Sequence, residues 1–488
     1  MNKQLVPSNN TISEVIIMSS FKLSFRRALT PLLAALVLAG CASTPILDAS
    51  HLPPTPTAFK ESAGPQAAAS AVATSAVPMA QAAWWKVFAD PVLDQLVDQA
   101  TRNNSSVQVA AGRLAQARAI ARSTDANRSV QAGLGAGAAR QTDSTANNLP
   151  RTTVSATASL SYEVDLFGKL AGASNAALLD ASAREALLRS TRLLVQADVA
   201  QTYLSLRALD AERTLVRDTL QAYRNTLRLT EVRLREGDVA ELDVARVRTE
   251  VASTESEALA LDRRRAELEH ALAVLVGEVA SNFQVTPAEW ATALPMIPAG
   301  VPSTVLARRP DVAAAQTSLQ AAQARVGVAQ TAWFPTFSLT ASGGYAAPEV
   351  GDLFKMSMRG WGIGALMSLP LFDGGRREAG VQGANADMDI ALAQYREQIL
   401  VAFRDVEDQL SALRLLGEQS DAQSRSVASA SRATLLSGVR YRNGLVSQLE
   451  VLDAQRSELS NRRQALQVKA AQYLSTVGLI RALGGGWA

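Results

Sequence analysis

The chain has 488 residues, 1 cysteine, 2 histidines and a formal net charge of +3. A single cysteine cannot form a disulfide within the chain, and a zinc cluster of cysteine and histidine ligands is not available. A catalytic triad that relies on histidine would have to use His51, in a Pro/Thr/Ala-rich stretch, or His270, in a charged helical stretch, so we expect no enzyme, no cofactor and no bound metal.

The first element along the chain is a leader, residues 1–40. Basic side chains precede an apolar stretch, residues 29–38, which is too short to span a bilayer and is typical of a secretory signal. It ends in Leu38-Ala39-Gly40-Cys41, which resembles a bacterial lipobox and predicts cleavage before Cys41 and acylation of its thiol, for example by palmitate. The alternative is an ordinary signal peptide with an incidental cysteine. The leader also carries the whole net positive charge, so composition does not indicate a nucleic-acid partner.

An extended tether is expected over residues 41–83, because this stretch is rich in Ala, Pro, Ser and Thr and poor in charge. No later stretch reaches 18 apolar residues without a charge. We therefore expect no transmembrane helix in the mature chain.

The rest of the chain is an internal duplication with an offset of 207 residues. The matches are Gln116-Ala117-Arg118 with Gln323-Ala324-Arg325, Gly168 with Gly375, Gly237 with Gly444, and Gly277 with Gly484. The predicted domains are a first repeat over 84–277, a proline-rich linker over 278–308 and a second repeat over 309–488.

Each repeat is predicted to contain a helix, two strands, a long helix, a tight turn and another long helix. Residues 169–231 carry helical spacing, and apolar positions between 244 and 275 alternate in steps of three and four, which is a heptad seam. About 60 residues would form a helix on the order of 90 Å long, far more than a compact globule needs. The helices alone also fit a lipid-anchored periplasmic coiled-coil scaffold without a pore.

Four strands are predicted, over 153–165, 336–345, 361–371 and, more weakly, 130–138. Apolar and polar side chains alternate strictly along 153–165 and 336–345, and in 361–371 the apolar side chains share one face with small residues opposite. Residues 130–138 are rich in Gly and Ala. Strands of this kind are typical of a transmembrane β-barrel, although a half-buried sandwich shows the same alternation.

One chain cannot close a wide barrel with four strands, and open edges are not tolerated in lipid. Three chains would supply 12 strands for one shared barrel, with the loops 143–151 and 346–358 outside. The predicted fold is therefore mainly α with a membrane β-barrel portion.

Several motifs follow one another in an order that resembles a known family. They are Trp84-Trp85 followed by Phe88 and Asp90-Pro91, Tyr162-Glu163-Val164-Asp165-Leu166-Phe167-Gly168-Lys169, Pro298-Ala299-Gly300-Val301-Pro302, Arg308-Arg309-Pro310-Asp311, and Pro370-Leu371-Phe372-Asp373-Gly374-Gly375-Arg376. On these motifs the chain, from Cys41 to Gly484, resembles the TolC family, and within it the OprM/NodT-like outer-membrane lipoproteins of RND-type efflux systems. One departure is that Trp333-Phe334-Pro335, before a strand of the second repeat, has only Asn127-Arg128 as its counterpart.

The resemblance implies a passive outer-membrane efflux channel. It implies a homotrimer with a shared 12-stranded barrel in outer-membrane lipid, whose long periplasmic coiled-coil helices continue as an α-barrel. It also implies a periplasmic adaptor (membrane fusion) protein and an inner-membrane RND transporter as partners. The alternative within the same fold is the outlet of a type I protein secretion system.

The two tight turns are the candidate adaptor-docking tips, because glycine suits a turn that needs a positive φ. The residues assigned to docking are Arg233, Leu234, Gly237, Arg440, Arg442 and Gly444. The alternative is a plain turn with solvated arginines.

A candidate periplasmic gate follows the second tip. Glu450 and Asp453 match the acidic pair of the family's closed end, and threefold symmetry would gather their carboxylates around one axis, where they repel one another and attract cations. Asp243 and Arg246 are the equivalents in the first repeat, and Arg246 or Tyr441 would latch the tip. The alternative is exposed helix charges without a gating role.

Overall fold

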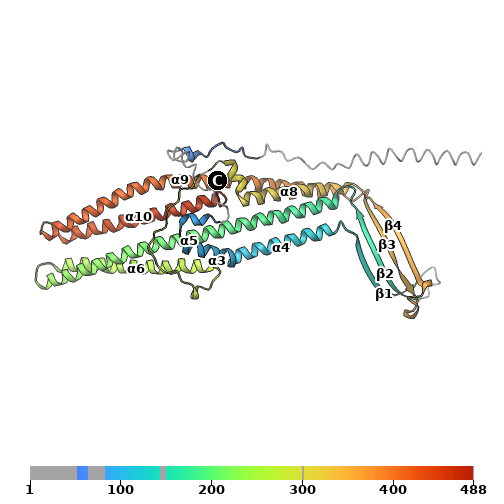
Figure 1. Cartoon of the computed structure of the whole chain (residues 1–488), viewed down its shortest axis with the longest axis horizontal. Coiled ribbons are helices and arrows are strands. Elements are labelled where there is room, and N and C mark those ends of the chain that lie inside the picture. The colour runs from blue at the N-terminus through green and yellow to red at the C-terminus, as the bar shows by residue number, and fades with distance from the viewer. Residues whose placement is uncertain (1–51, 64–82, 143–149, 299, 301, 487–488) are drawn as a thin grey trace, which may run out of the picture. The chain divides into compact units, whose positions relative to one another are not determined.

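The computed structural model describes residues 52–63, 83–142, 150–298, 300 and 302–486. The leader, Cys41 and most of the tether lie outside these residues. The described chain divides into two units (Figure 1). The strand unit comprises residues 119–179 and 320–390, and the helix unit comprises the remaining described residues.

The strand unit contains one antiparallel sheet with the order β1-β2-β3-β4. Its strands are β1 (Gln131–Thr142), β2 (Pro150–Val164), β3 (Thr336–Ala347) and β4 (Arg359–Ser368). All four predicted strands are present. The end predicted at residue 371 for the last strand is wrong, because Pro370 has no N–H to donate to the ladder.

The register places the alternating apolar side chains of all four strands on one face. Leu134, Ala158, Gly343 and Trp361 form one row across the sheet. Leu134 and Trp361 are 91% and 79% exposed, so none of the described residues covers this face. In the described residues β1 pairs only with β2 and β4 only with β3, which leaves the outer edges of the sheet unpaired.

Two very long helical hairpins follow the strand pairs. The helices are α5 (Lys169–Arg235), α6 (Glu241–Val276), α9 (Arg376–Arg442) and α10 (Gln448–Ala482), and Figure 1 shows the turns of both hairpins. α5 and α9 have 67 residues each, which corresponds to about 100 Å. The predicted long helix over 169–231 is confirmed and continues to Arg235.

Shorter helices precede the strands in each repeat. They are α3 (Pro91–Asn103) and α4 (Ser105–Ala126), then α7 (Pro302–Arg308) and α8 (Pro310–Gln330). Among the described residues, no helix is both long and apolar enough to cross a membrane.

The strand-to-helix junctions show why their motif occurs twice. The Asp165 carboxylate accepts a hydrogen bond from the backbone N–H of Ala171 at 2.7 Å, and the Asp373 carboxylate accepts one from the N–H of Arg377 at 3.2 Å. A carboxylate at this position satisfies free N–H groups and complements the positive end of the helix dipole. An aspartate in each junction therefore caps the helix that follows, although Asp165 lies four residues before the start of α5 and Asp373 three residues before the start of α9.

The duplication also appears in backbone geometry. The glycine pairs Gly168/Gly375, Gly237/Gly444 and Gly277/Gly484 all have positive φ, with values of 74°/86°, 81°/70° and 80°/89°. A Cβ on Gly277 would lie 2.7 Å from the Asn103 carbonyl oxygen, and a Cβ on Gly484 would lie 3.0 Å from the Arg308 carbonyl. Glycine is needed at these positions because the first turn closes against the end of α3 and the second against the end of α7.

The main core lies in the helix unit. Trp84 and Phe88 of the 3₁₀ helix Trp84–Phe88 are fully buried with side chains of α3, α5, α6 and α10. The Asp90 carboxylate caps α3 and accepts a hydrogen bond from the Tyr203 hydroxyl at 2.8 Å. These contacts fix the start of the first repeat to both hairpins.

Candidate functional site

The turns between the paired helices have the same hydrogen-bond pattern. In the first, the N–H groups of Gly237 and Asp238 donate to the carbonyls of Leu234 and Arg233 at 3.1 and 2.9 Å. The second repeats this with Gly444 and Leu445 donating to Tyr441 and Arg440 at 3.0 and 2.9 Å. This is a Schellman ending, which requires the left-handed conformation that both glycines adopt. Gly237 and Gly444 therefore act through the backbone.

A contact between the two tips was not predicted as a pair. The Arg233 guanidinium donates a hydrogen bond to the Tyr441 hydroxyl at 2.7 Å and lies over its ring, 5.5 Å from the centroid. Tyr441 was expected to latch the tip, and the structure supplies Arg233 as its partner. The sequence gives no signal for this pairing, because the two residues lie on different hairpins, 208 positions apart.

The acidic candidates lie in the first turns of the returning helices. Glu450 pairs with Arg440 across the second turn at 3.3 Å, and Asp453, one turn further along α10, is exposed. In the first repeat Arg246 pairs with Asp243 on its own helix at 3.7 Å. Arg246 therefore does not cross between hairpins in this structure, and the gating role of these side chains remains a prediction.

Apolar side chains accompany the charges at the tips. Leu242 and Leu445 are 58% and 67% exposed, and Arg442 is also exposed beside the second turn. Single exposed apolar side chains are common on protein surfaces, so these leucines do not by themselves identify a binding surface. The docking assignment for the tips remains a prediction.

Ion pairs that sequence reasoning missed connect α10 to the first hairpin. Arg456 pairs with Glu250, and Arg463 pairs with Glu212 at 2.8 Å and with Glu257. The hydrogen bond to Glu250 raises the pKa of the Arg456 guanidinium. Burial raises the pKa of the nearby Tyr223 hydroxyl to about 12. Polar pairs within such a seam fix which helix faces meet.

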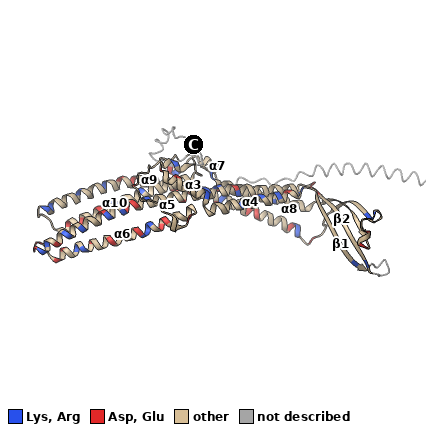
Figure 2. Cartoon of the chain, turned by 60° about the horizontal axis from the view of Figure 1, so that its bottom comes forward, with Lys and Arg blue, Asp and Glu red and all other residues tan. Residues whose placement is uncertain are grey.

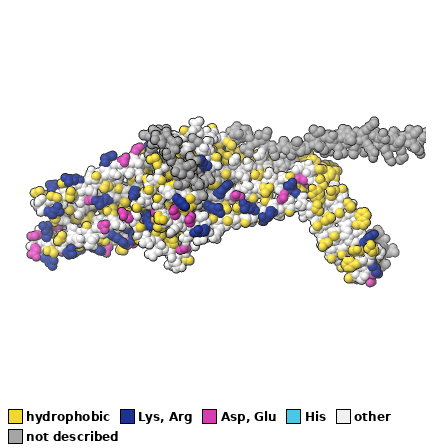
Figure 3. All heavy atoms as spheres, in the orientation of Figure 1, with side chains coloured by type: hydrophobic (Ala, Val, Ile, Leu, Met, Phe, Trp, Pro, Cys, Tyr) yellow, Lys and Arg dark blue, Asp and Glu magenta, His cyan; other side chains and the backbone are white. Residues whose placement is uncertain are grey.

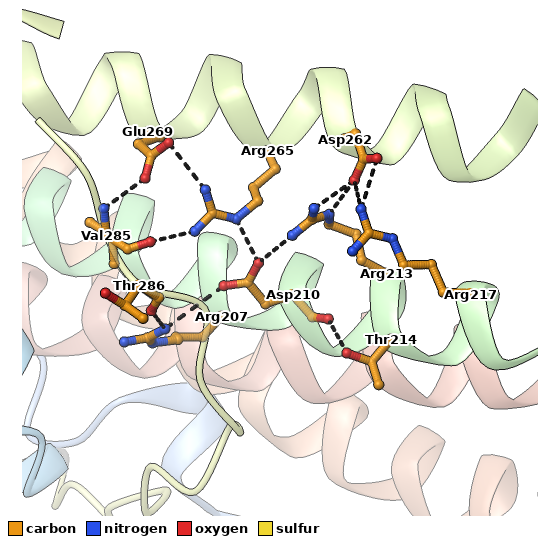
Figure 4. Close-up of polar contacts among 10 residues, drawn as sticks. All are labelled: Arg207, Asp210, Arg213, Thr214, Arg217, Asp262, Arg265, Glu269, Val285 and Thr286. Atoms are coloured by element: carbon orange, nitrogen blue, oxygen red, sulfur yellow. Dashed lines mark hydrogen bonds and ion pairs between the residues drawn. The ribbon is translucent and has the colours of Figure 1, made fainter. Parts of the chain in front are cut away.

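A larger cluster centres on Asp210 of α5 (Figure 4). Its buried carboxylate accepts hydrogen bonds from Arg265 at 2.8 Å and Arg213 at 3.0 Å, and Arg207 lies 3.8 Å away. These arginines also reach other elements. Arg265 and Arg207 donate to the backbone carbonyls of residues 285 and 286, in the segment after α6.

The Asp210 cluster therefore holds the start of the linker against the first hairpin. One signal for it was present in the sequence, because Arg265 occupies a position of the heptad seam where an apolar side chain is expected. The buried charge of Arg265 needs partners, but the heptad pattern does not predict which residues they are. Among the described residues, no group of three or more His, Cys, Asp or Glu side chains is arranged to hold a metal ion.

The sequence matches the family model described as outer membrane efflux protein over residues 96–278 and 301–485. The toluene efflux pump outer membrane protein TtgI of Pseudomonas putida is 33% identical over 468 residues, covering 94% of this chain and 98% of that protein. The pyoverdine export outer membrane protein OpmQ of Pseudomonas aeruginosa is 34% identical and covers 93% and 96% of the two chains.

Solved structures are similar over most of their length. The outer-membrane channel OprN has a TM-score of 0.80 at 29% identity, covering 92% of this chain and all of that one. The outer membrane protein VceC of Vibrio cholerae has a TM-score of 0.78 at 30% identity, covering 84% of this chain and all of that one. The two segments matched by the family model correspond to the two repeats.

Proposed function

Because this chain belongs to the outer membrane efflux protein family, we propose that it is the outer-membrane exit duct of an efflux pump, through which small molecules pass passively from the periplasm to the exterior. The family consists of channel proteins of efflux systems, so the expectation that the chain is not an enzyme is confirmed. The relatives named above serve efflux or export of small compounds, which favours efflux over protein secretion.

The observation that carries the proposal is the exposed apolar face of a sheet whose two outer edges are unpaired. Lipid offers no hydrogen bonds to these edge groups, so they must pair with another chain. We propose a homotrimer, because three copies of the β1-β4 sheet give 12 strands and one closed barrel. β1 and β4 of neighbouring copies would then pair in antiparallel fashion.

Partners on the periplasmic side are part of the proposal. The exposed Leu242, Leu445, Arg440 and Arg442 would meet a periplasmic adaptor, and the adaptor would couple the duct to an inner-membrane RND transporter. Acylation at Cys41 would add a lipid anchor in the outer membrane. Replacing Cys41 with serine should abolish incorporation of radiolabelled palmitate, and persistent labelling would exclude that site.

The test of the duct and its gate is single-channel recording of the purified trimer in planar bilayers. Glu450→Ala with Asp453→Ala should enlarge the conductance, because alanine removes the side chains that narrow the closed end and the negative charge that excludes anions. Glu418→Ala with Asp421→Ala, which deletes two exposed carboxylates at the same spacing on α9, is the control and should leave the conductance unchanged. A wild-type protein without conductance would refute the duct, whereas equal conductance in all variants would refute only the gate.

A further inference from the structure

The loop end of the apolar sheet face carries two arginines. Arg359 is the first residue of β4. In the register of the sheet, Arg359 lies opposite Tyr345, Tyr345 opposite Ala156, and Ala156 opposite Ala136. Arg140 lies four residues beyond Ala136 on β1 and therefore points to the same face. Both arginines thus belong to the apolar face, one on each edge strand.

The side chains that precede these arginines change in a regular order toward the loops. On β4 the apolar face presents Met367, Ala365, Ile363 and then Trp361 before Arg359. Tyr345, opposite Arg359, packs against Phe354 of the following loop with ring centroids 5.6 Å apart. Figure 3 shows hydrophobic side chains gathered over the strands. From the centre of a bilayer to its surface, the lipid-facing side chains of a barrel change from aliphatic to aromatic and then to charged.

Distances along the strands agree with this order. From Trp361 to Met367 the apolar stretch of β4 covers seven residues, and the six steps between them correspond to about 20 Å along the strand. From Ala132 to Ala138 the apolar stretch of β1 has the same length. Both arginines therefore lie just beyond the apolar band, where a charge on the lipid-facing side costs about 0–1 kcal/mol rather than the larger midplane cost.

Ion pairs occupy several basic groups near both ends of the sheet, including Lys355 with Asp352 in the loop before β4. At the helix end, Lys169 pairs with Glu163 at 2.9 Å and Arg377 pairs with Asp373 at 2.7 Å. At the loop end, neither Arg140 nor Arg359 forms an ion pair with a carboxylate of the described residues. Figure 2 shows that the strands carry little charge except near the loops. Arg140 and Arg359 can therefore bind an anion on the apolar face at the loop end.

We propose that Arg140 and Arg359 bind phosphate groups of the phosphorylated lipid in the leaflet on the loop side of the membrane. This inference rests on the proposed function, since it needs the sheet to face lipid. A guanidinium binds phosphate oxygens in a bidentate manner, and it keeps its charge at all physiological pH values. The occupant is a lipid rather than a free anion, because the same face presents exposed Trp361 and Ile363 to acyl chains.

The position of the arginines on opposite edges extends the proposal to the trimer. β4 of one copy would neighbour β1 of the next, so Arg359 and Arg140 of different copies would flank one seam between protomers. Each seam would then suit a lipid with two phosphates. The lipid would bridge the copies without contributing to the barrel hydrogen bonds.

The test uses purified, delipidated trimer and lipid A as the probe. Titration followed by native mass spectrometry should show binding of lipid A that carries two phosphates and at least about tenfold weaker binding of dephosphorylated lipid A, because charge-assisted hydrogen bonds are lost. The variant Arg140→Gln with Arg359→Gln should lose the preference for the phosphorylated form. Arg151→Gln, which lies at the same loop end but on the opposite face, is the matched control and should retain it.

Several results would overturn the inference. Equal binding of both lipids to the wild type would do so without any variant, and so would an equal loss in the Arg151 control. Competition by inorganic phosphate at a concentration equal to that of the lipid would show a free-anion site instead. Conductance is measured on every sample: a wild type that neither trimerises nor conducts refutes the proposed function, whereas a conducting trimer without lipid discrimination refutes only the arginine site.

Discussion

The Arg233 guanidinium and the Tyr441 hydroxyl, on the tips of different hairpins, are joined by a hydrogen bond of 2.7 Å. The guanidinium also lies over the tyrosine ring. Each partner stands in the last turns of a 67-residue helix, far from the main core of the helix unit. This pair therefore restrains the ends of α5 and α9, where few other contacts join the two hairpins.

Tyr441→Phe tests this restraint, since it removes the acceptor and keeps the ring. Arg233 is exposed, so we expect a loss of less than about 1 kcal/mol in unfolding free energy. The tips would separate more readily, and single-channel recordings should show longer or more frequent high-conductance events. Tyr395→Phe, on the same helix but away from the tip, is the control. Traces of the Tyr441 variant that match the wild type would show that the pair does not restrain the tips.

The elements of the fold could be predicted because periodicity is a local property. Alternation predicted the strands at 153–165 and 336–345 most clearly, whereas the Gly/Ala-rich strand at 130–138 was the weakest prediction. Spacings of three and four predicted the long helices, with errors of a few residues at their ends. The order β2-β3 within one sheet follows less directly, because more than 170 residues separate these strands. The duplication helped, since it showed that two like strand pairs had to be accommodated.

The candidate site could be predicted only in part. The tip glycines could be identified because they recur at the 207-residue offset between two long helical stretches, where a Schellman ending needs a left-handed residue, although the second hairpin holds other glycines such as Gly438. The partners of the charged side chains could not be predicted. Helical spacing relates Arg246 to Asp243, whereas it says nothing about which turn of another hairpin lies opposite Arg233 or Arg456.

Asp210→Asn should strongly destabilise the helix unit. The buried carboxylate neutralises Arg265 and Arg213, and its loss leaves buried guanidinium groups with incomplete compensation. Breaking a buried ion pair in this way costs about 3–5 kcal/mol. Thermal unfolding in detergent, followed by circular dichroism, measures the effect. Asp262→Asn, which removes a half-exposed partner of Arg213, should cost less than about 1 kcal/mol, and equal effects of the two changes would contradict the special role of Asp210.

Replacing Asp198 with asparagine should increase the free energy of unfolding in a pH-dependent way. Burial raises the pKa of its carboxyl, although Arg481 partly opposes this. Because the pKa is higher in the folded state, the stability contributed by this group is present at acidic pH and is lost as the pH rises through the raised pKa. Asp198→Asn should therefore be more stable than the wild type near pH 8, and the difference should vanish toward about pH 4.

Unfolding of this variant by urea at several pH values measures that difference. Asp218→Asn, at an exposed position on α5, is the control for removing a carboxylate from the helix. An Asp198 variant that is less stable than the wild type near pH 8 would contradict the prediction, since it would mean that the ionised carboxylate is favourable where it stands.

Glu407 of α9 should determine whether the described part of the N-terminal segment stays docked. Its carboxylate accepts hydrogen bonds from the backbone N–H groups of Lys60 and Glu61 at 2.8 and 3.0 Å, while Phe59 is buried beside Phe403. Glu407→Ala leaves both N–H groups without this acceptor, and because water reaches the exposed Lys60 N–H, the cost is only about 0.5–1.5 kcal/mol. Trypsin should then cleave after Lys60 several-fold faster than in the wild type.

Mass spectrometry of the released fragment identifies that cut. Asp421→Ala, at an exposed position of the same helix, is the control, because no ion pair or hydrogen bond joins Asp421 to the described part of the segment. Phe59→Ala should accelerate the same cleavage, since it removes the buried ring while leaving Glu407 in place. Unchanged cleavage in both variants would mean that other contacts dock the segment and that neither the carboxylate nor the ring holds it against α9.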